Sequence, residues 1–131
     1  MTSSRQCVLL DTSILIDLLR RRRESVERLR ELTLGGFEMA TAAVCIAEVY
    51  AGIRKGEESR TEALLSSLGC LPLSRRIAQR AGEITAARRR IGRTHFLDDM
   101  MIAATAMEHG CGLWTNNRKD FDLPELDLFP E

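Results

Sequence analysis

The sequence predicts an α/β fold with a mainly parallel sheet and helices on both faces. Short apolar runs of strand length alternate along the chain with segments of helical periodicity, and this alternation is typical of parallel sheets with crossover helices. The 131 residues contain no linker-like stretch and no internal repeat, so we expect a single domain over residues 1–131. Hydrophobic residues make up 44% and charged residues 29%, which excludes a disordered or fibrous chain.

The first half of the chain opens with the apolar run Cys7–Leu10, which Asp11 stops and which we expect to be a buried strand. Thr12-Ser13 then offers a helix N-cap. The elements expected after this strand are a helix running into Arg20–Arg23, a helix through Val26, Leu29 and Leu32 that Gly35-Gly36 stops, a strand at Phe37–Thr41, and helices at Ala43–Arg54 and Arg60–Leu68.

The second half continues the alternation. Pro72 favours an edge position for its strand, because proline cannot donate to a neighbour. Ser74 fits the N-cap of a long helix, and Gly110 fits the position after a later one. The elements expected there are a strand at Cys70–Leu73, a helix through Ile77, Ala81 and Ile84, a loop at Gly92–His95, a helix at Leu97–His109, a strand at Gly112–Thr115, a polar loop at Asn116–Pro124 and a last strand at Leu126–Phe129.

Charge and hydropathy exclude several classes of protein. Nineteen basic residues balance nineteen acidic ones and the pI is about 6.7, which excludes a globally basic nucleic-acid coat but not a local basic face. No apolar run approaches the ~18 residues of a membrane span. The first apolar run is also too short for the core of a signal peptide. We therefore expect a cytoplasmic protein with no part in a membrane.

The cysteines are widely spaced, lie in apolar contexts and form no CxxC pair. They are Cys7, Cys45, Cys70 and Cys111. We expect reduced, buried thiols, and neither a disulfide framework nor a zinc site.

Arginine supplies seventeen of the nineteen basic residues. The segment Arg75–Arg93 carries seven arginines against one acid, Glu83. It is either a solvated helix face, with arginines favoured near the helix C-terminus, or a surface that follows an RNA backbone. Aromatic residues are too few for the sequence to predict a stacking surface for unpaired bases.

Two acids stand out in the first half of the chain. Asp11 directly follows a strand, at the end where open parallel sheets bind ligands. It could instead cap the next helix, although Thr12 or Ser13 could also do so. Glu48 is the only charge between Val44 and Ile53, and a helix that is apolar nearly all round should be mostly buried. Glu48 is therefore either a site residue or half of a structural salt bridge to an arginine.

Further acids lie in the second half. Asp98 and Asp99 open the helix at Leu97–His109; one of them would satisfy the helix dipole, so we expect the other to point elsewhere. Thr115-Asn116-Asn117 leaves the end of a strand, with Asp120 three residues on. Taken alone, this segment would be an ordinary polar turn.

These acids could converge at one edge of the sheet, where they would repel one another unless a divalent cation lay among them. The only histidines, His95 and His109, do not accompany them. Ligation by oxygen alone favours Mg²⁺, with Mn²⁺ as its substitute, and disfavours zinc. Mg²⁺ held by carboxylates is the usual machinery for phosphodiester cleavage.

Four motifs span residues 9–121: Leu-Leu-Asp11-Thr-Ser, Ala-Glu48-Val-Tyr-Ala-Gly, Asp99-Met-Met-Ile-Ala-Ala-Thr-Ala and Thr-Asn-Asn117-Arg-Lys-Asp120-Phe. In their order and spacing the chain resembles the PIN-domain ribonucleases, and specifically the VapC-type toxins of bacterial toxin–antitoxin pairs. The resemblance implies a doubly wound, five-stranded parallel sheet with a central first strand. It also implies a Mg²⁺-dependent endoribonuclease acting on RNA, a homodimer, and a VapB-type antitoxin as partner.

Carried over residue by residue, the resemblance also implies the site. The acids expected to hold the metal and to act in catalysis are Asp11, Glu48, Asp99 and Asp120. Asp99 is preferred to Asp98 because the family's acid lies three residues before an Ile-Ala pair, here Ile102-Ala103. The side chains expected to position a water or a phosphate oxygen are Thr12, Ser13, Thr115 and Asn117. Asn117 stands where many PIN domains carry an acid, so it adds no charge.

Two alternatives stay open. A phosphate-accepting signalling domain also gathers acids at strand ends and binds Mg²⁺ without cutting RNA. Such a domain usually carries a lysine after its last strand, and neither Lys55 nor Lys119 is in that place. An inert interaction module would use its acids only as caps and salt bridges and would bind no Mg²⁺. A nucleotide-binding enzyme is disfavoured, because no Gly-rich phosphate loop is present.

Overall fold

The computed structural model describes residues 6–129 and contains a four-stranded sheet in which every neighbouring pair of strands is parallel. The strand order is β3-β2-β1-β4, with bounds β1 (Cys7–Leu10), β2 (Glu38–Ala42), β3 (Gly69–Leu71) and β4 (Cys111–Trp114). β1 lies inside the sheet, where Leu9 and Leu10 are fully buried, as parallel strands covered on both faces are. The internal place of β1 and the edge position of β3 agree with the predictions from sequence.

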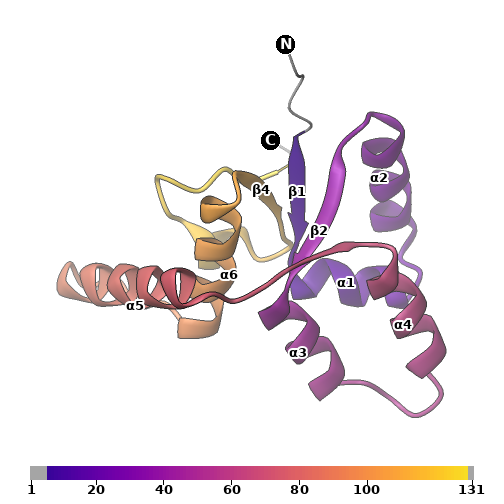
Figure 1. Cartoon of the computed structure of the whole chain (residues 1–131), viewed down its shortest axis with the longest axis horizontal. Helices are drawn as coiled ribbons and strands as arrows, with labels where there is room; N and C mark the ends of the chain where they lie inside the picture. The colour runs from indigo at the N-terminus through magenta and orange to yellow at the C-terminus, as the bar shows by residue number, and fades with distance from the viewer. Residues whose placement is uncertain (1–5, 130–131) are drawn as a thin grey trace.

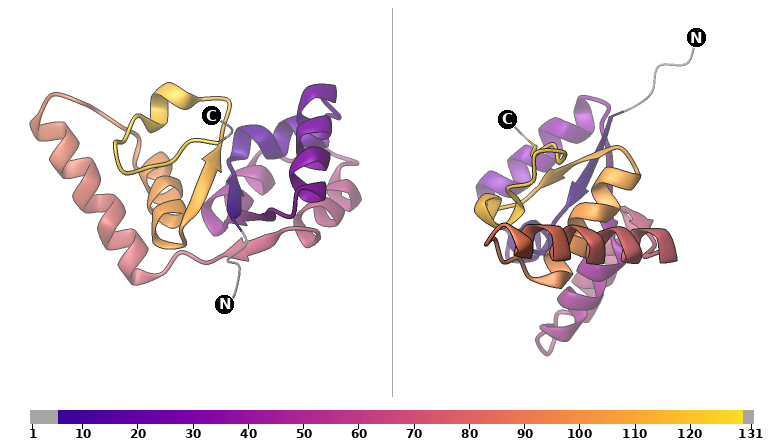
Figure 2. Two further views of the ribbon diagram at one scale, coloured as in Figure 1. Left: turned by 90° about the horizontal axis from the view of Figure 1, so that it is seen from above. Right: turned by 90° about the vertical axis from the view of Figure 1, so that its left-hand side faces the viewer.

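Helices connect the strands and cover the sheet. Their bounds in the described part of the chain are α1 (Thr12–Leu19), α2 (Arg23–Leu34), α3 (Ala43–Ala51), α4 (Glu58–Ser66), α5 (Arg75–Arg90), α6 (Leu97–Glu108) and the short 3₁₀ helix η1 (Arg118–Phe121). Figures 1 and 2 show α5 and α6 on one side of the strands, and α2 and α4 on the other. The predicted α/β class is confirmed. Between residues 6 and 129, no helix combines the length and apolarity needed to cross a membrane.

The parallel arrangement decides where the polar residues gather. Because all the strands point the same way, their carboxyl ends lie at one edge of the sheet. At this edge β1 leads into Asp11, β2 leads directly into α3, and β4 leads into Thr115. The register pairs Leu10 with Thr41 on one side and with Trp114 on the other. Segments far apart in sequence are thereby held side by side.

Two predicted helices end earlier than expected. α1 stops at Leu19 and α2 begins at Arg23, so the basic run between them is a tight connection in which Arg21 takes a positive φ of 56°. α3 ends at Ala51 and is not buried all round, since among its residues only Cys45 and Val49 are fully buried. One face of α3 packs on α1 and α6, and its other face meets solvent.

The last predicted strand, Leu126–Phe129, is reduced to an isolated parallel bridge between Leu113 and Leu128. Two backbone hydrogen bonds form there: Leu113 N donates to Asp127 O at 2.8 Å, and Phe129 N donates to Leu113 O at 2.7 Å. The turn just before it, in which Leu126 N donates to Leu123 O, brings the segment to β4 over too short a length for a ladder. The described sheet therefore has four strands and one flanking bridge where five strands were expected.

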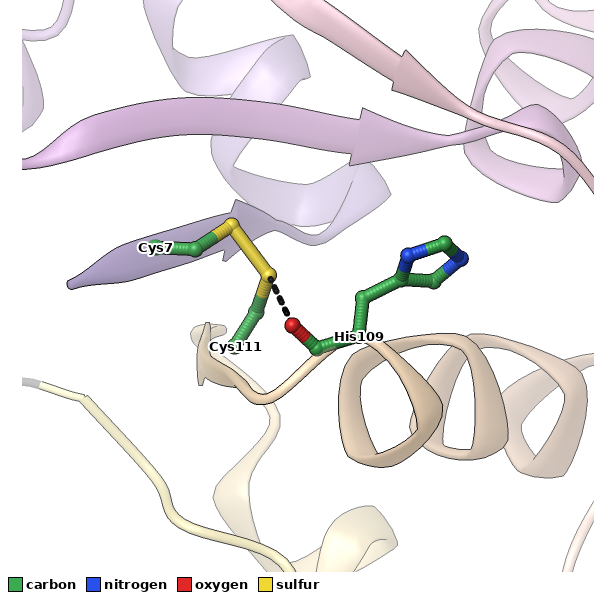
Figure 3. Close-up of a disulfide and its surroundings, with 3 residues drawn as sticks. All are labelled: Cys7, His109 and Cys111. Atoms are coloured by element: carbon green, nitrogen blue, oxygen red, sulfur yellow. Dashed lines mark hydrogen bonds between the residues drawn. A yellow bond between two sulfur atoms is a disulfide. The ribbon is translucent and has the colours of Figure 1, made fainter. Parts of the chain in front are cut away.

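The prediction of reduced thiols is wrong for Cys7 and Cys111, which form a disulfide between β1 and β4 (Figure 3). The register sets these residues opposite each other with their Cα atoms 4.5 Å apart, a separation that a disulfide spans. A sequence separation of 104 residues hides this proximity. The other two cysteines are free; Cys45 is buried as expected, whereas Cys70 is exposed.

Candidate active site

Asp11 is the most enclosed acid at the carboxyl edge of the sheet, with 4% of its surface exposed. Its backbone caps α1, since its carbonyl accepts from Ile14 N and Leu15 N, but its side chain makes no capping hydrogen bond. Oδ2 of Asp11 instead accepts from Ser13 Oγ at 3.0 Å and from Thr115 Oγ1 at 2.6 Å. The alternative of a side-chain cap is therefore excluded for Asp11.

The hydroxyls around Asp11 join the ends of β1 and β4. Thr115 Oγ1 accepts from Asn117 N at 3.0 Å, and Ser13 Oγ accepts from Asn116 N at 3.1 Å. Each hydroxyl thus donates to the carboxylate and accepts from the loop. Of the four residues expected to position a water or a phosphate, three therefore lie beside Asp11. Ser13 and Thr115 contribute their hydroxyls and Asn117 contributes its backbone N–H.

Glu48 projects from α3 toward the start of α1. Thr12 Oγ1 donates to Glu48 Oε1 at 2.5 Å, so the fourth expected positioning residue, Thr12, serves a different carboxylate. Within residues 6–129 Glu48 has no ion pair with an arginine, which removes the salt-bridge alternative. Burial, followed by hydrogen bonding to Asp98 and repulsion from Asp98 and Asp11, raises the pKa of Glu48 to about 7, against the opposing hydrogen bond from Thr12.

Asp99 is half-buried in the first turn of α6, whereas Asp98 is exposed. Neither caps the helix through its side chain. Burial raises the pKa of Asp99 to about 6, with further contributions from the charges of Asp98, Asp11 and Asp120. The sequence preference for Asp99 left Asp98 out of the site, yet Asp98 acts on both Glu48 and Asp99. The adjacency of Asp98 and Asp99 in the sequence was the signal that both could belong to the site.

Asp120 lies on η1 and is exposed. Its backbone N–H donates to Asn117 O at 2.9 Å, which fixes the turn that carries it. The Asp120 charge reaches the cluster through its effect on Asp99. Asp99 and Asp120 line a cavity of about 250 Å³, whereas Glu48 lines a separate hollow of about 50 Å³ beside Val49 and Thr61.

A second polar network beside the site was not predicted. Asp17 of α1 accepts from Ser25 Oγ at 3.0 Å and from Asn116 Nδ2 at 2.9 Å, and it pairs with Arg22 at 3.3 Å. These contacts satisfy the Asp17 carboxylate and tie α1 to α2 and to the loop after β4. No special residue type or spacing marks Asp17 in the sequence, and its role is structural.

The carboxylates of the site are the type of ligand that a hard divalent cation prefers. Every donor is an oxygen, and the raised pKa values of Glu48 and Asp99 arise partly from neighbouring carboxyls, a repulsion that a cation would relieve. Over residues 6–129 no three His, Cys, Asp or Glu side chains already stand close enough to form a metal cage. Mg²⁺ does not need one, because it usually keeps several waters and takes only one or two carboxylates.

Comparisons with known proteins agree on one family. The PIN domain family model matches residues 8–125. The chain is 33% identical over 121 residues to "Ribonuclease VapC19" of Mycobacterium tuberculosis, covering 90% of this chain and 95% of that protein. It is 30% identical over 119 residues to "Ribonuclease VapC2" of Haemophilus influenzae, covering 87% and 89% of the two chains.

Solved structures with the same fold include a chain of a toxin–antitoxin complex from Klebsiella pneumoniae. That chain is 34% identical to this one, with a TM-score of 0.73 and coverage of 91% of this chain and 94% of that one. A chain of VapBC2 from Rickettsia felis, bound to a DNA fragment from its promoter, superposes with a TM-score of 0.85, at 24% identity and with coverage of 94% and 97%. At that identity the second likeness concerns the fold alone.

Proposed function

The chain belongs to the PIN domain family and is related to VapC ribonucleases, and we propose that it is itself a metal-dependent endoribonuclease, the toxin of a VapBC-type toxin–antitoxin pair. One observation carries the proposal. A buried aspartate, Asp11, is oriented by two hydroxyls at the end of β1. Its charge, like that of Asp98, helps to raise the pKa of both Glu48 and Asp99. An acidic centre of this kind suits phosphodiester hydrolysis.

The metal we propose is Mg²⁺, which Mn²⁺ can replace, because all the donors are oxygens. Asp11 and Asp99 would hold it, with Glu48 and Asp120 nearby. When bound, such a cation neutralises charge on the phosphate and lowers the pKa of water.

The chain's own residues have separate tasks in this proposal. Glu48 and Asp120 orient the attacking water, and Glu48 accepts its proton, since a carboxyl whose pKa is raised to about 7 exchanges protons near neutral pH. Ser13 and Thr115 hold the Asp11 carboxylate in one orientation. Thr12 holds Glu48, and Asn117 lies on the loop that leads to Asp120.

The proposed partner is a VapB-type antitoxin. The chain of the Klebsiella complex, at 34% identity, supports this inference. A homodimer and a cytoplasmic location belong to the same proposal; the location follows because the proposed substrate is cellular RNA. The alternative of a phosphate-accepting signalling domain gains no support from the family match.

The decisive experiment is cleavage of total tRNA and rRNA by purified protein freed of antitoxin, in Mg²⁺ and in EDTA. We expect cuts in Mg²⁺ only, and their loss in Asp11→Asn. The matched control is Asp127→Asn, which removes an exposed carboxylate outside the acidic cluster and should cut as the wild type does. Cuts that persist in EDTA or in folded Asp11→Asn would refute the proposal. Folded protein that binds Mg²⁺ without cutting any RNA would favour the signalling domain.

A further inference from the structure

Phe96 exposes an aromatic ring beside the acidic site. Its exposed fraction is 76%, a large value for an apolar side chain. Phe96 occupies the N-cap position of α6, three residues before Asp99. Within residues 6–129 its ring stacks on no other aromatic ring. Neither the core nor the proposed mechanism uses this side chain, so it is available to contact a ligand.

Phe96 lines the same cavity of about 250 Å³ as two of the acids, Asp99 and Asp120. Two cations, Arg93 and Lys119, line it as well. Lys119 makes no hydrogen bond or ion pair with the residues that the structure describes. The cavity is smaller than the roughly 300–1,000 Å³ that encloses a drug-sized ligand, so it suits one nucleotide of a longer strand. One small space therefore brings together an apolar face, free positive charge and the acids.

The loop that presents Phe96 is held in place. Asp122 Oδ2 pairs with Arg93 Nη1 at 2.5 Å, and its carbonyl accepts from Arg88 Nη2 at 3.1 Å. Arg88 Nε also donates to His95 Nε2 at 3.3 Å. Only 7% of the His95 side chain is exposed. Its neighbour Phe96 has extended backbone angles, φ −73° and ψ 138°, and faces outward. Because the backbone is already fixed there, only the side-chain torsions of Phe96 have to be ordered on binding.

From these observations we propose that Phe96 stacks on an unpaired base of a single-stranded RNA, and that Lys119, with Arg93, contacts the phosphates beside that base. This inference rests on the proposed ribonuclease function and names the form of its substrate. Only an unpaired base offers a free face to a ring, because paired bases are stacked inside their helix. Phe96 is in this view a positioning residue that sets which nucleotide lies at the acids.

The competing explanation is that Phe96 contacts a protein partner instead of an RNA base. Ile91 and Leu97 are also exposed, at 66% and 47%, and could extend an apolar contact. A protein covering Phe96 would also have to desolvate Lys119, Asp99 and Asp120 in the same cavity, which is unfavourable unless each charge is paired. An RNA strand needs no such burial, since its phosphates meet the cations while its base meets the ring.

The test measures binding without cleavage. Short single-stranded RNAs that carry the fluorescent base 2-aminopurine are titrated with protein in Ca²⁺ in place of Mg²⁺. We expect the base fluorescence to be quenched by wild type, and Phe96→Ala to lose the quenching and to bind more weakly by between about 5-fold and about 150-fold. Phe96→Trp should restore both. Leu97→Ala is the matched control, an exposed apolar neighbour whose removal should change affinity less than about twofold.

Two further measurements separate the readings. For Lys119→Gln, we expect the slope of log affinity against log salt to fall by about 0.7 on single-stranded RNA. The Phe96→Ala effect should vanish on a fully paired duplex of the same sequence. The inference is overturned if Phe96→Ala binds single strands as wild type does, if it weakens duplex binding equally, or if it changes the molecular mass of the protein in solution. The last result would assign the ring to a protein interface. A protein that binds single strands through Phe96 but cuts no RNA in Mg²⁺ would refute the ribonuclease alone.

Discussion

Thr115 donates a hydrogen bond of 2.6 Å to Asp11, although 104 positions of sequence separate the two residues. Asp11 follows β1 and Thr115 follows β4, so this bond joins the carboxyl ends of two neighbouring parallel strands. It occupies Oδ2 of Asp11 together with the bond from Ser13. The carboxylate is therefore oriented by the protein alone, before any cation or substrate arrives.

Thr115→Val should weaken both the fold and the reaction. The variant keeps the shape of the side chain but removes the donor to Asp11 and the acceptor for Asn117 N. We expect a loss of about 1–3 kcal/mol in the free energy of unfolding, because a buried bond to a charged group is lost. The cleavage rate should fall as well. Urea unfolding and RNA cleavage measure the two effects, and Thr115→Ser, which keeps the hydroxyl, should recover most of both. Valine at wild-type stability and rate would contradict this role.

Adding Mg²⁺ should stabilise the folded protein, and EDTA should reverse the gain. A ligand that binds only the folded state adds about 2.7 kcal/mol at a concentration of about 100 times its Kd. Thermal melting with and without Mg²⁺ measures this increment. Asp11→Asn should lose most of it, while Asp127→Asn should keep it. An increment of equal size in Asp11→Asn would place the cation elsewhere.

The metal-free protein should become less stable as the pH rises from about 4.5 to about 7. Over this range the folded protein keeps a proton on Glu48, whose pKa is raised from 4.5 to about 7, while the unfolded chain has released it. The folded state then binds more protons, so the free energy of unfolding falls with pH. The raised pKa of Asp99 acts in the same direction.

Urea unfolding in EDTA across this range tests the effect of Glu48. The free energy of unfolding of wild type minus that of Glu48→Gln should fall steadily with rising pH, because glutamine does not titrate. Parallel curves for the two proteins would show that Glu48 does not titrate in this window.

Reduction of the Cys7–Cys111 disulfide should destabilise the protein without silencing the site. A cross-link closing a loop of about 100 residues contributes up to about 4.7 kcal/mol by restricting the unfolded chain, and here the separation is 104. Urea unfolding with and without reductant measures the loss. Cys7→Ser should match the reduced protein, and Cys70→Ser, which removes an exposed free thiol, should match the wild type. Unchanged stability on reduction would contradict the prediction, because it would mean that breaking the cross-link does not increase the conformational entropy of the unfolded chain.

The sequence predicted the elements whose signals are local. Asp11 was identified because it stops an apolar strand, and Glu48 because it is the lone charge in an apolar segment. α6 was expected at Leu97–His109 and lies at Leu97–Glu108. In each case a short window of residues contains the physical cause, either hydrophobic periodicity or a charge that interrupts it.

Other features depend on contacts between distant segments. Cys7 lies opposite Cys111 only because β1 pairs with β4 in one register. Asp98 joins the cluster because α6 begins near Glu48 of α3. The exposure of Phe96 likewise follows from how its loop is anchored to Asp122, whereas its apolar character alone predicts burial.

β1 and β4 are fastened at both ends, by a disulfide where they start and by the Thr115–Asp11 bond where they finish. Asp11, which directly follows β1, is thereby tied to both strands. Phe96, just before α6, and Lys119, on η1, are exposed and take no part in these bonds. In the proposed ribonuclease, substitutions at such exposed positions can therefore change which RNA is bound and leave the buried carboxylate of Asp11 in place.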